Sequence, residues 1–216
     1  MTRGLFVTVD GPSGVGKSTT VRTLQSILEN RGCHNILLTT EPPHTALGAF
    51  TRQNAGTIHG LALACLVAAA RYEHIESTVT PAMAEGRLLI SDRYLASTFA
   101  LQRLDGVPLE YLIALNKHAP NPDLAVILTA SADTIAKRIA AAGVTHRFRG
   151  DPKGPEQEVA LYDDAAEVLE QRGVDVLRVN SSTITPSVVA GQIAEAILRR
   201  WIPSVASTAP LTPQES

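Results

Sequence analysis

The sequence predicts an α/β fold in which a five-stranded parallel sheet is flanked by helices on both faces. Short runs rich in leucine and β-branched residues alternate along the 216 residues with longer segments of helical spacing. The apolar positions of the short runs are nearly continuous, which is typical of strands whose two faces are both buried. A glycine-rich segment, VDGPSGVGKSTT, lies between the first short run and the first helical segment.

The short runs are the expected strands of this sheet. They span Leu5–Asp10, Asn35–Thr40, Arg87–Asp92, Asp123–Thr129 and Asp175–Val179. Parallel strands cannot be joined by a tight turn and need a crossover, usually a helix. We therefore expect helices between them.

The helical segments are expected at about Lys17–Asn30, Thr57–Val79, Pro108–Lys117, Ala132–Ala142, Glu156–Arg172 and Pro186–Trp201. The last of them repeats apolar residues at every fourth position, which predicts a core-facing stripe. The segment GLALACLVAAA is the most apolar, but it is shorter than the roughly 20 residues that cross a bilayer. We expect it to be a buried helix of one domain, residues 1–202, followed by a disordered tail, residues 203–216, that is rich in Pro, Ser and Thr.

The composition favours an ordinary cytoplasmic enzyme. A formal net charge of −2, with 19% charged and 44% hydrophobic residues, gives no broad basic field, so neither a nucleic acid polymer nor a membrane is an expected partner. Cys33 and Cys65 form neither a close pair nor a metal-type spacing and are expected to be reduced. Four histidines show no metal spacing and are expected on the surface or in local structure, namely His34, His59, His74 and His118.

The glycine-rich segment matches the phosphate-binding pattern G-x-x-x-x-G-K-[ST] at every specified position. Its glycines let backbone N–H groups surround the phosphates of a nucleotide, and the start of the following helix adds a positive dipole end. Lys17 is expected to reach the β- and γ-phosphates, and Ser18 to bind Mg²⁺. The predicted donor-binding residues here are Gly11, Ser13, Gly14, Val15, Gly16, Lys17, Ser18 and Thr19.

A phosphate loop alone does not separate kinases from GTPases or motor ATPases. The segment NKHA resembles the guanine-reading N-K-x-D of GTPases, but Ala119 cannot accept hydrogen bonds from guanine. The segment also ends a predicted helix where a strand would be needed, and no D-x-x-G element lies between the second and third strands. A GTPase is therefore disfavoured.

Charged residues stand where the second and third strands end. Asp92 and Arg93 belong to LLISDRY, and Glu41 belongs to TTEPPHT. Ligands of open α/β sheets collect at this carboxyl edge. Asp92 can hold the Mg²⁺ shell together with Ser18, while Arg93 can neutralise charge on a transferred phosphoryl group.

With these residues the chain resembles the thymidylate kinases, P-loop enzymes that pass the γ-phosphate of ATP to dTMP. The matching segments are DGPSGVGKST, TEPPHTALGAFTR, AAARYEHIESTVTPAMAEGRLLISDRYLAST and NPDLAVILTASADTIAKRI, which follow one another in the order and spacing of the family. The resemblance implies the P-loop kinase fold with ATP and Mg²⁺ as cofactors. It also implies a homodimer paired through helices on one sheet face, to which the helix containing Leu61 to Ala70 could contribute.

The resemblance assigns roles residue by residue. Asp10 matches a position near the acceptor sugar, Arg52 the arginine that grips the acceptor phosphate, and Arg71 the arginine that addresses the base. Asp92 and Arg93 match the pair at the site of phosphoryl transfer. The expected acceptor-binding residues are Asp10, Glu41, Arg52, Arg71, Arg93, Phe99 and Gln102.

The segment after the fourth strand matches the lid of these kinases, at about residues 143–157. Its sequence, GVTHRFRGDPKGPEQE, carries Arg147 and Arg149. Family members whose phosphate loop lacks an arginine supply one from this lid, and GPSGVGKS has none. The resemblance therefore makes Arg147 a catalytic residue beside Lys17, Asp92 and Arg93, and Arg149 a donor-binding one.

The chain departs from the family in the acceptor pocket. Val67 or Ala68 stands where an aromatic ring usually stacks on thymine, and Leu101 replaces a tyrosine that favours deoxyribose. The segment TTEPPHT stands in place of T-R-E-P-G-G-T and lacks its arginine and two glycines, and Pro42 and Pro43 stiffen a turn that glycines would leave permissive. Phe99 is a candidate to supply an aromatic contact from another wall.

Three functions remain open from the sequence. The first is a kinase for dTMP or a related nucleoside monophosphate. The second is a kinase of the same scaffold for another nucleotide or a small biosynthetic intermediate, in which Asp10 or Glu41 could serve as a base if the acceptor is an alcohol. The third is an ATP-binding regulatory protein without an acceptor.

Overall fold

A parallel sheet forms the centre of the computed structural model, which describes residues 3–142 and 154–201. Within these residues the sheet has five strands in the order β2-β3-β1-β4-β5, and every neighbouring pair is parallel. The strands are β1 (Leu5–Asp10), β2 (Ile36–Thr40), β3 (Leu88–Asp92), β4 (Leu124–Thr129) and β5 (Val176–Asn180). Each expected strand is confirmed, with bounds that differ by no more than one residue.

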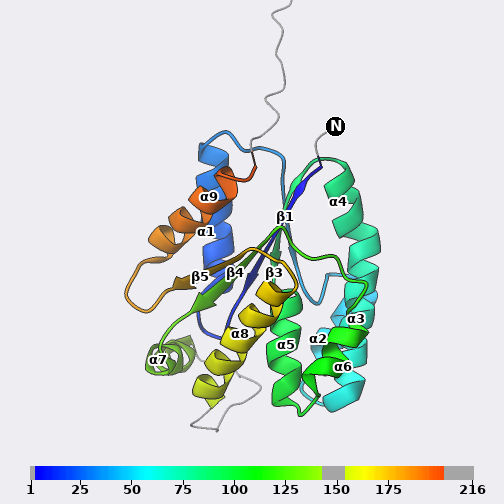
Figure 1. Cartoon of the computed structure of the whole chain (residues 1–216). Helices are drawn as coiled ribbons and strands as arrows, with labels where there is room; N and C mark the ends of the chain where they lie inside the picture. The colour runs from blue at the N-terminus through cyan, green and yellow to red at the C-terminus, as the bar shows by residue number, and fades with distance from the viewer. Residues whose placement is uncertain (1–2, 143–153, 202–216) are drawn as a thin grey trace, which may run out of the picture.

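The helices connect the strands as crossovers (Figure 1). They are α1 (Lys17–Asn30), α2 (Ala46–Asn54), α3 (Gly60–His74), α4 (Thr80–Ala84), α5 (Leu95–Leu104), α6 (Leu109–Leu115), α7 (Ala132–Ala142), α8 (Gly154–Gln171) and α9 (Pro186–Leu198), and a π-helical turn, Ile75–Val79, joins α3 to α4. The predicted tail and most of the predicted lid, with Arg147 and Arg149, lie outside the described residues. None of the helices within the described residues is long and apolar enough to span a membrane.

Two hydrophobic clusters hold the helices on the two faces of the sheet. On one face α1 and α9 pack together, with Leu24 and Ile193 fully buried. On the other face α3, α5 and α8 cover the sheet, with Leu95, Phe99 and Leu169 in the cluster. Burial on both faces explains why the strands lack polar alternation.

The structure corrects the expected helices at three places. The helices α2 and α5 were not predicted from helical spacing, and the segment expected at Thr57–Val79 begins at Gly60 and continues through the π turn into α4. In α2 the Thr45 hydroxyl accepts a hydrogen bond from Gly48 N at 3.1 Å, which is an N-cap. In α5 most residues are buried, so an amphipathic period is absent from its sequence.

Candidate active site

The phosphate loop connects the end of β1 to the start of α1 and depends on glycine for its path. Gly11, Gly14 and Gly16 have φ angles of 147°, 75° and 105°, a region that side chains rarely tolerate. A Cβ atom on Gly11 would lie 2.3 Å from the carbonyl oxygen of Leu128. The loop therefore packs against β4 while α1 begins at Lys17, where helix N–H groups can face an anion.

The ammonium group of Lys17 lies inside this loop. Its Nζ atom donates hydrogen bonds of 2.8 Å to the carbonyl oxygens of Gly11 and Pro12, and the residue is only 6% exposed. Burial, with repulsion from Arg93 as the next cause, lowers the pKa of Lys17 to about 7. A phosphate placed in the loop would supply the counter-charge that this buried amine needs.

Ser18 and Asp92 meet at the mouth of the loop, as the sequence predicts for a shared magnesium shell. The Ser18 hydroxyl donates to Asp92 Oδ2 at 2.7 Å, which joins α1 to the end of β3. Both groups present oxygen atoms, the ligand type that Mg²⁺ prefers. The residues present therefore fit a magnesium ion that is also bound by nucleotide phosphates.

Two side chains that the sequence analysis missed support the loop from distant elements. Glu158 of α8 is 1% exposed and accepts hydrogen bonds from Ser13 N at 3.0 Å and from the Ser13 hydroxyl at 3.3 Å. Arg138 of α7 donates to the carbonyl oxygen of Val15 at 3.2 Å. Glu158 and Ser13 are 145 residues apart, and no motif marks either supporting residue.

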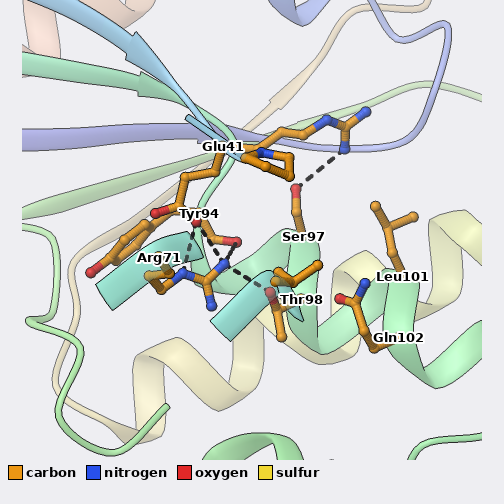
Figure 2. Close-up of a pocket in the computed structure, with 10 residues that line it drawn as sticks. Glu41, Arg71, Tyr94, Ser97, Thr98, Leu101 and Gln102 are labelled. Atoms are coloured by element: carbon orange, nitrogen blue, oxygen red, sulfur yellow. Dashed lines mark hydrogen bonds and ion pairs between the residues drawn. The ribbon is translucent and has the colours of Figure 1, made fainter. Parts of the chain in front are cut away.

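A pocket opens beside the loop at the same edge of the sheet (Figure 2). It brings together four of the predicted acceptor-binding residues, Glu41, Arg71, Arg93 and Gln102, and also Val67 and Leu101. The other lining residues are Pro42, Tyr94, Ser97 and Thr98. Ser97, Thr98, Leu101 and Gln102 all come from α5, the helix that its spacing did not reveal.

Arg71 lies at the floor of the pocket in a dense polar network. Its Nε atom donates to Glu41 Oε2 at 2.7 Å, and its Nη2 atom donates to Thr98 Oγ1 at 2.8 Å (Figure 2). Its guanidinium also lies over the Tyr94 ring, 5.0 Å from the centroid. Burial acts to lower the pKa of Arg71, but the Glu41 carboxylate outweighs burial and raises it, so Arg71 stays charged.

Three further predicted residues take other positions. Asp10 is fully buried, and its Oδ1 atom accepts hydrogen bonds from Tyr94 N and Ser97 N at 2.9 and 3.0 Å. Burial raises the pKa of Asp10, while these bonds act against the rise. Phe99 is also fully buried and belongs to the core cluster, not to the pocket lining described above. Arg52 lies at the end of α2 and donates to the carbonyl oxygen of Pro42, next to the pocket.

Comparison with known proteins agrees with this site. A family model described as thymidylate kinase matches residues 9–173. A probable thymidylate kinase of Caldivirga maquilingensis is 36% identical over 148 residues, which cover 67% of this chain and 72% of the relative. One from Pyrococcus horikoshii is 36% identical over 154 residues, covering 68% and 75%. A thymidylate kinase of Xanthomonas campestris is 37% identical over 142 residues, covering 65% and 62%.

The family match spans the phosphate loop, β3 with the Asp92–Arg93 pair at its end, and all of α8. The phosphate loop and the residues that line the pocket therefore lie within the residues that the family model matches. The chain belongs to the thymidylate kinase family.

Proposed function

We propose that the protein transfers the γ-phosphoryl group of ATP to dTMP and releases ADP and dTDP. The position of the Asp92–Arg93 pair supports this transfer. Asp92 contacts Ser18 of the phosphate loop at 2.7 Å, while Arg93 lines the pocket beside it. A donor bound in the loop and an acceptor bound in the pocket would thus meet at these two residues.

The transfer is a direct in-line displacement without a covalent enzyme intermediate. An oxygen of the acceptor phosphate attacks the γ-phosphorus, and the bond to the oxygen that bridges the β- and γ-phosphates breaks. Lys17 and the loop N–H groups hold the donor phosphates, and Arg93 offsets charge on the moving group. Arg52 approaches the acceptor phosphate from the Pro42 side of the pocket, where its guanidinium already lies.

The cofactors are ATP and Mg²⁺. Ser18 and Asp92 would hold the metal ion, which supplies positive charge to the phosphate oxygens when it is bound. From the predicted lid, Arg147 adds a cation at the moving phosphoryl group and Arg149 binds the donor. Closure of that segment would also exclude water, which otherwise competes as an acceptor.

A second candidate function is the phosphorylation of a different acceptor. The side chains that line the pocket support it. Val67 and Leu101 both line the pocket, so aliphatic side chains occupy the places of the stacking ring and the sugar-facing tyrosine. A methyl-bearing pyrimidine can still pack against these aliphatic groups. Loss of the tyrosine, however, weakens exclusion of a 2′-hydroxyl group.

The first experiment measures ADP release with ATP and Mg²⁺ across dTMP, dUMP, UMP, dCMP, CMP, AMP, GMP and the matching nucleosides. We expect dTMP to give a kcat/KM at least about tenfold above every other acceptor, and Asp92→Asn to lower that value by about 100-fold or more. If another compound in the panel is preferred, the second candidate replaces the first. ATP binding with no acceptor above the ATPase background would instead indicate a regulatory protein.

We further propose that the protein is a homodimer that pairs through α3. Leu61 is 54% exposed, and Cys65, one turn later on the same helix, is also exposed. Tyr111 of α6 is 38% exposed and lies next to Cys65, with 3.5 Å between the hydroxyl and the sulfur. Large apolar groups gathered on neighbouring helices are typical of a surface that is buried by a partner.

A further inference from the structure

A buried histidine lies directly beneath the floor of the acceptor pocket. His74 stands three residues after Arg71 on α3, and both residues are only 1% exposed. They contact different oxygens of the same carboxylate: Arg71 Nε reaches Glu41 Oε2 at 2.7 Å, and His74 Nδ1 lies 3.2 Å from Glu41 Oε1. Glu41 itself is 5% exposed, so few waters can replace either contact.

The far side of the imidazole is also engaged. His74 Nε2 lies 2.7 Å from Thr39 Oγ1, and Thr39 belongs to β2. Arg71 also donates to Thr98 Oγ1, which lines the pocket, at 2.8 Å, and to the buried Asn116 Oδ1 at 2.7 Å. A continuous polar chain therefore runs from the sheet, through His74 and Glu41, to the Arg71 guanidinium at the pocket.

The partners of the ring decide where its proton lies. A carboxylate can only accept hydrogen bonds, so Nδ1 must carry the hydrogen that faces Glu41. The hydroxyl of Thr39 can then donate to Nε2, which needs no hydrogen of its own. A neutral imidazole with the proton on Nδ1 satisfies both contacts and adds no second positive charge beside Arg71.

We propose that His74, as the Nδ1–H tautomer, is a positioning residue for acceptor recognition that fixes Glu41 and, through Glu41, the direction of Arg71. The proposal rests on the proposed function, because it takes this pocket as the acceptor site. The last torsion of a glutamate side chain is soft, and Arg71 contacts Oε2 alone, from Nε and Nη2 at 2.7 Å each, so Arg71 by itself does not fix the plane of the carboxylate. The contact of His74 with the other oxygen, Oε1, fixes that plane, and the Arg71 guanidinium has to match it.

Three substitutions separate positioning from simple packing. Asn places an amide N–H close to the position of Nδ1, Gln places its amide one bond further out, and Leu provides no polar group. We expect His74→Asn to keep the KM for dTMP within about threefold of the wild type. We expect His74→Gln and His74→Leu to raise it by about tenfold or more, because Glu41 Oε1 loses a buried partner.

The KM for ATP is the internal control. It should change by less than about twofold, because the donor loop lies on other elements. His34→Gln, at an exposed histidine before β2, should leave both constants unchanged. Thermal unfolding identifies any variant that fails to fold. If the Leu variant fails to fold, the Asn and Gln variants still test the proposal. An unchanged KM for dTMP in His74→Gln, or equal rises in both constants, would overturn the proposal.

A spectroscopic measurement tests the tautomer without any nucleotide. Long-range ¹H–¹⁵N correlation spectra of the wild type, assigned by comparison with His74→Asn, should show a protonated Nδ1 and an unprotonated Nε2 at neutral pH. A proton on Nε2 alone would contradict the assignment. Because this spectrum contains no substrate, it gives its answer even if dTMP is not an acceptor, so failure of the proposed function remains distinguishable.

Discussion

We expect the charge of Lys17 to depend on the bound nucleotide. Within the described residues its ammonium donates to the carbonyl oxygens of Gly11 and Pro12, and burial, followed by repulsion from Arg93, lowers the pKa of Lys17 to about 7. Donor phosphates bring negative charge next to this amine, which favours its protonated form. Binding of ATP should therefore be coupled to the uptake of a proton.

We expect an uptake of about 0.9 proton per ATP at pH 8, because an amine with a pKa of about 7 is mostly neutral there before binding and charged afterwards. Calorimetric titrations in two buffers of different ionisation enthalpy, HEPES and Tris, give this number directly. Lys17→Arg is the matched control, since a guanidinium is always charged and should bind without the uptake. Equal proton uptake by the two proteins would contradict the coupling.

Among the elements, α5 connects the core to the acceptor pocket. Ser97, Thr98, Leu101 and Gln102 occupy the face that lines the pocket, while Phe99 points into the hydrophobic cluster. This division explains why a helix without an amphipathic pattern can carry much of the pocket. It also places Phe99 where its aromatic ring supports the helix.

The turn between β1 and α1 depends on the absence of a side chain at Gly11. We expect Gly11→Ala to lower the free energy of unfolding by about 2–4 kcal/mol, because its φ is 147° and the new Cβ would lie 2.3 Å from Leu128 O. Gly191→Ala is the opposite control, since Gly191 is inside α9 with nothing within 4 Å of the added Cβ. It should raise stability by up to about 1 kcal/mol. Urea denaturation measures both, and a loss in both variants would refute the argument from the close approach.

For the whole molecule, the proposed dimer predicts which exposed apolar residue is needed for association. Leu61→Glu should raise the dimer dissociation constant by about 100-fold, because a charge would be buried in the interface. Val188→Glu on α9, where Val188 is 48% exposed, should leave the association unchanged. Sedimentation velocity over a range of concentrations compares them, and a wild-type protein that stays monomeric at tens of micromolar would exclude the dimer.

Much of the molecule follows from local patterns in the sequence. The strands are visible because burial on both faces demands continuous apolar runs, and the phosphate loop is visible because its glycines and Lys17 stand at fixed spacing. The resemblance to thymidylate kinases depended on such ordered segments, and the family match confirms it. These features are local because neighbouring residues in the chain create them.

The partners that each functional group contacts depend on the packing of distant elements. Glu158 contacts Ser13 across 145 residues, and His74 meets Glu41 across 33. The helix α5 is recognised as a pocket wall only when its neighbours are known, because burial removes the polar face that would reveal its period. A polar chain such as Thr39, His74, Glu41 and Arg71 exists because the sheet and α3 are packed together. Its residues do not form a recognisable motif in the sequence. The physical requirement to pair buried polar groups acts only after that packing has formed.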